Sequence, residues 1–443
     1  MQSIAEASTS IETVSQCATG APHDAQRDAR QRSASRNGGA EGASWDTTVS
    51  VDVEREGRRA AVRRGRYEMQ DRLFSLLPDD SRECACHRVA SKAGAVVYLD
   101  SENHARYGGV YRCGNPWVCP ICAPVIATKR ASEIDSILKW ADAEGFSFYK
   151  FAFTSRHKLS DKLIVLLEKQ AKALKAFKNG YLVKKTRDEM GYVDSITAKE
   201  ATWGPVSGWH PHQHEYWMCN DKEFDMEKVG CELEREWIRV MRKYGLDGAE
   251  GVALHIKKMN KDEIRKGAAS GYLSKAGSAA TYLSKAGSAA AIELAGGVYK
   301  KAKRPHKQDH FTQMELLAVG TKWANDLFVE FYQAFKGKKQ IVFGRIIKRS
   351  FGDLFGTEPD NDFKVVEHEN EKKPDEHIAL ALEPGRLSLL RRTKKAVRVL
   401  ELVEMGLIGE AQELIEKVWD DWVNSNYRWA VARLWQQGFF GRV

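Results

Sequence analysis

Three histidines within five residues, His210, His212 and His214, are the side chains of this sequence best suited to bind a metal ion. They belong to the stretch Gly208-Trp-His-Pro-His-Gln-His-Glu-Tyr-Trp-Met218, whose aromatic end favours a β-strand. Residues two apart on a strand share a face, with Cβ atoms on the order of 7 Å apart. His212 and His214 can therefore direct their imidazoles at one divalent ion. The simpler alternative is a solvent-facing run of histidines that binds no ion.

The elements around these histidines must fix where the imidazoles point. Pro211 cannot donate a hydrogen bond in a sheet, so we expect the strand to begin just after it, with His210 at the entrance as a further ligand or a substrate contact. Residues 195–203 form a second expected strand, and the short connection between the two predicts an antiparallel pair. Glu200 then becomes a candidate third ligand. An exposed strand glutamate is the alternative, because sequence does not determine the register.

A cluster of cysteines forms a second candidate metal site. Five of the eight cysteines lie in one segment: Cys84, Cys86, Cys113, Cys119 and Cys122. The Cys-Pro-Ile-Cys turn presents two thiolates to a tetrahedral ion, and Cys113 with one of Cys84, Cys86 or His87 would complete four ligands. Such a zinc site would be structural, because four protein ligands leave no position for water. Buried or reactive free thiols are the alternative.

A duplicated segment carries candidate nucleophiles. Residues 272–281 and 282–291 agree at nine of ten positions, and each copy starts with Tyr-Leu-Ser-Lys. The two copies supply Tyr272 with Lys275 and Tyr282 with Lys285. Ten residues of α-helix rotate by two full turns plus roughly 280°, so the two tyrosines cannot occupy the same place on one straight helix. The surrounding segment is rich in lysine and arginine, which favours a phosphate backbone as its partner.

Composition narrows the class of protein. The 443 residues are 43% hydrophobic, enough for at least one substantial core, and carry a formal charge of +9, which favours a polyanionic partner. No apolar run reaches the roughly 18 residues of a membrane helix, and no secretory signal pattern opens the chain. We therefore expect a cytoplasmic protein without membrane association, in which cysteine clusters bind metal rather than form disulfides.

Composition shifts along the chain predict five regions. These are a disordered tail at 1–66, a zinc-binding segment at 67–135, a catalytic domain at 136–356, an acidic linker at 357–385 and two C-terminal helices within 386–443. Inside the catalytic domain, alternation predicts strands at 146–154 and 252–256, and helical spacing predicts helices at 159–177 and 224–244. His255, on the second of these strands, is expected to be a satisfied histidine rather than a ligand.

The motifs in this order resemble plasmid rolling-circle replication initiators of the His-hydrophobic-His (HUH) endonuclease superfamily. The resemblance covers about residues 80–356. It includes the histidine strand followed by Tyr-Leu-Ser-Lys, the cysteine cluster, Phe153-Thr-Ser-Arg-His157, Gln313-Met-Glu-Leu-Leu317 and Phe335-Lys-Gly-Lys-Lys-Gln340. One departure is Gln213, which stands where the family usually has an apolar residue between the metal histidines.

The resemblance implies an α+β fold in which helices flank a central antiparallel sheet. It implies that His212 and His214 bind Mn²⁺ or Mg²⁺, and that Tyr282 or Tyr272 is the nucleophile with Lys285 or Lys275 beside it. Tyr282 is preferred, because it keeps its spacing to the downstream Glu-Leu-Ala-Gly-Gly and basic run. A glutamate that ends the reaction in some relatives has no counterpart one turn before either tyrosine.

The implied activity is nicking and rejoining of single-stranded or hairpin origin DNA. A phenol is a poor nucleophile at neutral pH because its pKa is about 10, so a metal-polarised phosphate and a nearby lysine are needed. Attack would leave a 5′-phosphotyrosyl link and a 3′-OH primer. No Gly-x4-Gly-Lys-Ser/Thr motif occurs, so a host helicase and polymerase are expected partners. The alternatives are a transposase of the same superfamily and a zinc-containing DNA-binding regulator without catalysis.

Overall fold

The chain folds into antiparallel sheets flanked by helices, which confirms the α+β class expected from the sequence. The computed structural model describes residues 47–77, 86, 94–220, 226–259, 310–355, 362–367 and 371–436. Six residues expected at the two sites lie outside the described residues: Cys84, His87, Tyr272, Lys275, Tyr282 and Lys285. Among the described helices, none combines the length and the apolar character that crossing a bilayer requires.

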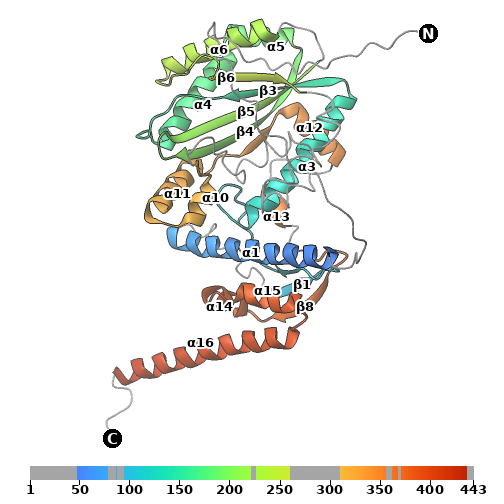
Figure 1. Cartoon of the computed structure of the whole chain (residues 1–443), viewed down its shortest axis with the longest axis vertical. Coiled ribbons are helices and arrows are strands. Elements are labelled where there is room, and N and C mark those ends of the chain that lie inside the picture. Colours follow the sequence, from blue (N-terminus) through green and yellow to red (C-terminus); the bar gives the residue numbers. More distant parts are fainter. Residues whose placement is uncertain are drawn as a thin grey trace, which may run out of the picture.

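The larger sheet has five strands in the order β6-β3-β5-β4-β7, and every neighbouring pair is antiparallel (Figure 1). Its strands are β3 (Phe146–Phe153), β4 (Tyr192–Gly204), β5 (Gly208–Asn220), β6 (Leu254–Lys258) and β7 (Ile341–Phe343). The histidine strand β5 is therefore central, between β3 and β4. As predicted, it pairs antiparallel with the strand that precedes it, and the pairing runs from Tyr192 opposite Cys219 to Gly204 opposite Gly208.

Strand β5 begins earlier than the sequence predicts. Pro211 lies inside it, opposite Ala201 of β4. Strand β3 ends at Phe153, opposite Gln213, so at Pro211 the described part of β5 has β4 as its one neighbouring strand. Proline is tolerated at such a position, because a sheet edge requires no backbone donor on its open side.

Helices cover both faces of this sheet. Their bounds are α3 (Cys122–Ala143), α4 (Leu163–Asn179), α5 (Tyr181–Glu189), α6 (Met226–Lys243), α10 (Gln313–Val319), α11 (Lys322–Phe335) and α12 (Arg345–Phe355). On one face, Trp209, Trp217 and Cys219 of β5 join a buried cluster with residues of α4, α6, α10 and α11. On the other face, Tyr216 and Met218 join a cluster with residues of α3 and α12. This second cluster covers the Asn220 end of β5.

Local signals explain the ends of α10. Thr312 and Glu315 form a capping box, in which the Thr312 side chain accepts from the Glu315 backbone and the Glu315 carboxylate accepts from the Thr312 backbone N–H. Gly320 ends the helix with a φ of 68°, a left-handed conformation that glycine adopts without a steric penalty.

A smaller sheet joins distant parts of the chain in the order β2-β1-β8. It consists of β1 (Ala95–Leu99), β2 (Ala105–Gly108) and β8 (His377–Leu382), and it packs with α1 (Thr47–Leu76), α13 (Asp362–Glu367), α14 (Arg386–Arg392), α15 (Ala396–Glu404) and α16 (Ile408–Gln436). Arg106 makes a bidentate contact with Glu376, and the Tyr107 hydroxyl donates to the Ala396 carbonyl at 2.8 Å. Figure 1 shows this second layer below the larger sheet.

Three predicted regions need correction. Residues 47–66, assigned to a disordered tail, belong to α1, and ion pairs from Arg63 to Glu404 and from Arg64 to Glu401 attach this charged helix to α15. The stretch 357–385, assigned to a linker, contains α13 and β8, and β8 hydrogen-bonds along β1. The C-terminal region holds three described helices rather than two. In each case tertiary pairing stabilises a segment whose local pattern is weak.

We expect Trp237→Ala to lower the free energy of unfolding by about 3–5 kcal/mol, measured by urea denaturation. Trp237 is completely buried, its indole N–H donates to the Thr154 carbonyl at 3.2 Å, and its ring meets Phe153 and Phe177 edge-on at 5.3 and 5.5 Å. Trp422→Ala is the control, because that side chain is 41% exposed on α16 and its loss should cost less than about 0.5 kcal/mol. Similar losses in both variants would contradict this packing.

Candidate catalytic face and cysteine cluster

The three histidines of β5 lie on one face of the larger sheet. They alternate with Trp209, Pro211 and Gln213, so the pleat turns all three imidazoles to the same side. The rings of His210 and His212 are stacked with centroids 4.0 Å apart, and those of His212 and His214 are nearly parallel at 6.0 Å. The structure thus places the predicted pair side by side, with His210 extending the row.

Glu200 belongs to the same site. The sequence does not determine the register of β4 and β5. In the structure, this register puts Glu200 directly opposite His212. The Glu200 Oε1 atom lies 3.2 Å from His214 Nε2. Because a carboxylate only accepts, the Nε2 atom carries the proton of this hydrogen bond. The other ring nitrogen, Nδ1 of His214, is buried and makes no hydrogen bond, so its lone pair can bind a cation.

This donor set fits a divalent cation, although the ligands do not form a closed cage. Metal-binding histidines commonly donate their second N–H to a carboxylate, which is the arrangement of His214 and Glu200. Glu200 therefore suits the role of a partner that orients His214 as well as that of a direct ligand. Among the described residues, the cysteines are the one group of three or more candidate ligands whose donor atoms lie within 4.8 Å of one another.

His210 is neutral over the ordinary pH range. Its pKa is lowered to about 3, first because burial disfavours the imidazolium and then because His212, His157 and His310 lie close to it. The ring of His157 is 4.5 Å from that of His210, and His157 Nδ1 donates to the Ser207 carbonyl at 2.7 Å. The Phe-Thr-Ser-Arg-His motif thus ends beside the histidine row, a proximity that spacing alone did not predict.

The unusual Gln213 is accommodated on the opposite face. Its amide donates to Glu215 at 2.6 Å, the Trp217 indole donates to the same carboxylate at 3.1 Å, and Lys178 forms an ion pair with it. Burial alone would raise the pKa of Glu215, but Lys178 and these hydrogen bonds hold it below its ordinary value. The side-chain amide of Gln213, between His212 and His214, therefore has a hydrogen-bond partner within the packed sheet.

The histidine face also bears two lysines, a placement that spacing alone did not predict. Lys150 of β3 and Lys257 of β6 are directly opposite each other, one row from His214. The small side chains of Ala152 and Ala198 flank His214 on its two neighbouring strands. The alternation of residues 146–154, which predicts the buried face of this strand, also predicts the face on which Lys150 lies.

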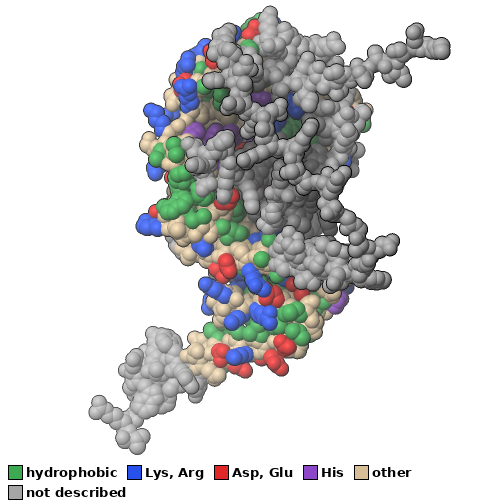
Figure 2. Space-filling model, viewed as in Figure 1, with side chains coloured by type: hydrophobic (Ala, Val, Ile, Leu, Met, Phe, Trp, Pro, Cys, Tyr) green, Lys and Arg blue, Asp and Glu red, His purple; other side chains and the backbone are tan. Residues whose placement is uncertain are grey.

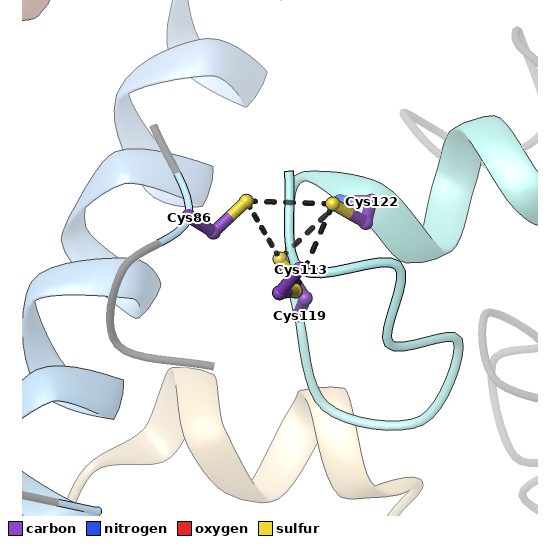
Figure 3. A group of neighbouring side chains, drawn as sticks. All are labelled: Cys86, Cys113, Cys119 and Cys122. Atoms are coloured by element: carbon purple, nitrogen blue, oxygen red, sulfur yellow. Dashed lines mark hydrogen bonds between the residues drawn. The ribbon is translucent and has the colours of Figure 1, made fainter. Parts of the chain in front are cut away.

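The cysteine cluster contains Cys86, Cys113, Cys119 and Cys122 (Figure 3). The Sγ atoms are 3.4 Å apart for Cys86 and Cys122, 3.5 Å for Cys86 and Cys119, and 3.8 Å for Cys113 and Cys122. Four thiolates at zinc's bond length of about 2.3 Å would have sulfurs about 3.8 Å apart, so the spacing fits a tetrahedral site. Of the three upstream candidates, Cys86 belongs to this cluster, and Cys84 and His87 lie outside the described residues.

The chemistry of the thiols agrees with metal binding. All four are unpaired cysteines rather than disulfides, and Cys86, Cys119 and Cys122 are fully buried. Hydrogen bonds from the other three hold the pKa of Cys122 well below its ordinary value despite its burial, whereas the pKa values of Cys113 and Cys119 are raised, so one thiolate of the cluster is favoured before any metal binds. The Cys122 backbone N–H also donates to Cys119 Sγ at 3.3 Å, which gives the Cys-Pro-Ile-Cys turn the geometry of a knuckle.

The candidate nucleophiles lie outside the described residues, but both ends of their segment are placed. At one end, Met259 donates its backbone N–H to the Phe148 carbonyl at 2.8 Å, just after β6. At the other, Phe311 and Trp203 exchange two backbone hydrogen bonds of 2.7 and 2.8 Å. The segment therefore leaves and rejoins the sheet that bears the histidines.

We expect Cys119→Ser to lose bound zinc and to lower the unfolding temperature. The wild-type chain should carry about one zinc ion, measured by inductively coupled plasma mass spectrometry. Cys219→Ser is the matched control, because Cys219 is equally buried but packs on the larger sheet outside the cluster. Zinc retained in Cys119→Ser, or absent from both proteins, would contradict the assignment.

Comparison with known proteins places the chain among replication proteins. Over 149 residues it is 31% identical to "Protein rep" of Streptomyces lividans, covering 28% of this chain and 32% of that protein. Over 147 residues it is 29% identical to the "Neomycin resistance protein" of Streptomyces cyanogenus, covering 28% and 31%. The chain thus spans about a third of the length of these relatives. No solved structure matches it.

The family assignment rests on a longer match. A model of the replication protein family (Rep_1) matches residues 107–383, which is more than half of the chain. This range contains the histidine face, three of the four clustered cysteines and β8. It confirms the resemblance to replication initiators that the motifs indicated. The chain belongs to the Rep_1 family of replication proteins.

Proposed function

We propose that this chain initiates rolling-circle replication of a plasmid by nicking one strand of its origin with a tyrosine and later rejoining that strand. Membership of the replication protein family supports the role. The observation that carries the enzymatic part is the histidine face, where three imidazoles and Glu200 lie together on the central strands. We also infer that the five-stranded antiparallel sheet is the HUH endonuclease fold, within a catalytic domain of residues 136–356.

The histidine face would hold the catalytic cation and the scissile phosphate. His212 and His214, with Glu200 and His210 as further ligands, would bind Mn²⁺ or Mg²⁺, and the bound ion would polarise the phosphate. The opposed Lys150 and Lys257 supply positive charge for the phosphates next to it. Gln213 and Glu215 act from the opposite face, where their hydrogen bond holds the strand between the two ligands.

The nucleophile in this proposal is Tyr282, with Tyr272 as the other copy. Its phenolic oxygen forms a bond to phosphorus while the bond from phosphorus to the 3′ oxygen breaks. The phenol loses its proton, and the leaving 3′ oxygen gains one. Lys285 or Lys275 stabilises the charge that develops. The products are a 5′-phosphotyrosyl link and a 3′-OH that a host polymerase extends after a host helicase opens the duplex.

The cysteine cluster has a structural role in this proposal. The Cys86 carbonyl accepts from the Gln70 side chain at 2.6 Å, and Gln70 accepts from Arg391 at 2.7 Å. Zinc held by the four thiolates would therefore stabilise the contact between α1, α3 and α14. With all four positions taken by protein, this ion would have no part in cleavage.

Combining His212→Ala with His214→Ala should abolish cleavage, because the phosphate would lose its cation. The assay incubates the protein with a single-stranded, origin-like oligonucleotide and Mn²⁺ and detects the covalent adduct on a denaturing gel. His104→Ala is the control, because that histidine pairs with Asp100 in the smaller sheet layer. An adduct that persists in the double variant, with an unchanged circular dichroism spectrum, would refute the clamp.

Tyr282→Phe should remove the adduct, whereas Tyr272→Phe should leave it, because a phenyl ring has no nucleophilic oxygen. Tyr181→Phe serves as the control, since that side chain is 82% exposed on α5. The reverse result would assign the reaction to the first copy. An adduct in the double variant, which lacks both hydroxyls, would exclude Tyr272 and Tyr282 as the nucleophile. Tight duplex binding without any adduct in the wild-type protein would support a regulator instead.

A further inference from the structure

Three aromatic rings form a partly exposed cluster at the end of the larger sheet where the histidine row begins. They belong to Trp203 of β4, to Phe311, which lies just before α10, and to Trp323 of α11. The ring of Trp323 lies 5.6 Å from that of Trp203 at a tilt of 35°, and 5.6 Å from that of Phe311 in an edge-on contact. The side chain of Trp323 is 44% exposed. Figure 2 shows hydrophobic side chains over α10 and α11 next to histidine side chains.

Trp323 stays partly exposed although its neighbours on the same helix are buried. Trp323 lies in the first turn of α11, whose neighbouring Ala324 and, one turn on, Phe328 are completely buried in the core. The indole packs on the rings of Trp203 and Phe311, and two backbone hydrogen bonds between these two residues fix their relative position. A large aromatic ring that is supported on one side and open on the other provides a flat surface for a planar ligand.

The cluster adjoins the histidine row at the end of the sheet. Trp203 pairs with Trp209, so its ring lies on the face opposite to His210. Phe311 directly follows His310, whose ring lies beside Gly204 at the turn between β4 and β5. At the same end of the sheet, Gly208 has a φ of 77°, and a Cβ there would lie 2.8 Å from the Cα atom of Leu159 and from the Lys158 carbonyl. The exposed side chain of Lys158 adds positive charge at this end. A nucleic acid strand that lies on the histidines passes this edge.

We propose that Trp323, supported by Trp203 and Phe311, stacks on an unpaired base of the DNA strand whose phosphates lie on the histidine face. The inference rests on the proposed function, which places DNA on that face, and adds a site that takes a nucleobase. Every base has a π-face, so the contact is independent of sequence. Bases inside a duplex are already stacked on each other, so the contact selects single-stranded DNA or a hairpin loop over duplex.

The test measures binding without cleavage. The full-length wild type and Trp323→Ala are titrated without added Mn²⁺ or Mg²⁺, and without a chelator that would remove zinc, against three fluorescein-labelled ligands: oligothymidylate, the same backbone with abasic sites, and a duplex of equal length. Fluorescence anisotropy is recorded. Trp323→Ala should bind oligothymidylate about tenfold more weakly than wild type. On the abasic strand and on the duplex, the two proteins should bind equally.

Two further variants separate stacking from folding. Trp323→Phe keeps a ring and should stay within about threefold of wild type on oligothymidylate. Trp422→Ala removes a tryptophan of similar exposure from α16 and should bind like wild type. The proposal is overturned by equal binding of Trp323→Ala and wild type to oligothymidylate. It is also overturned by an equal loss on the abasic strand, or by a wild type that does not bind oligothymidylate.

These outcomes are independent of the reaction. A wild-type protein that binds oligothymidylate through Trp323 but forms no adduct with Mn²⁺ would refute tyrosine nicking and leave the stacking site intact. A protein that forms the adduct with undiminished affinity in Trp323→Ala would refute the stacking site alone. After the second result, the exposed tryptophan would be expected to contact a protein partner instead of a base.

Discussion

The pairing of β4 with β5 is the interaction on which the histidine face depends. Its register puts Glu200 opposite His212 and leaves His214 with its Nε2 atom on the Glu200 carboxylate. Side chains alternate along a strand, so a slip of one residue would send the imidazoles into the aromatic core and bring Gln213 and Glu215 to the other surface. That alternative would leave a buried charge without Lys178, which makes the observed register strongly favoured.

The same strand separates two kinds of chemistry. One face holds imidazoles whose neutral form binds cations, and the other holds a carboxylate that is ionised because Lys178, Trp217 and Gln213 compensate for its burial. Arg187 lies over the rings of both Tyr192 and Trp217, at 4.6 and 4.5 Å, and closes the aromatic side of this network. Contacts on the opposite face thus hold the histidine strand rigidly, which keeps the three imidazoles in one geometry.

The sequence predicted elements best where a single pattern persisted over many residues. The alternation of 146–154, the histidine strand and the apolar spacing of 159–177 each match an observed element within a few residues. The place of Cys86 in the cysteine cluster, and the contact between Glu200 and His214, depend on pairing between segments, which spacing does not encode. Strand β8 was missed because its short His-Ile-Ala-Leu-Ala-Leu run follows an acidic stretch, and its partner β1 is far away in the chain.

That remote pairing has a consequence for the order of synthesis. A ribosome releases β1 and β2 long before β8 emerges. While the whole larger sheet is translated, the smaller sheet can therefore consist only of the β1–β2 hairpin. Contacts between remote residues form late, because a long loop must first close. Nascent chains that stop before residue 377 would therefore hold the histidine strand and the four clustered thiols but expose one edge of β1, a surface on which molecular chaperones commonly act.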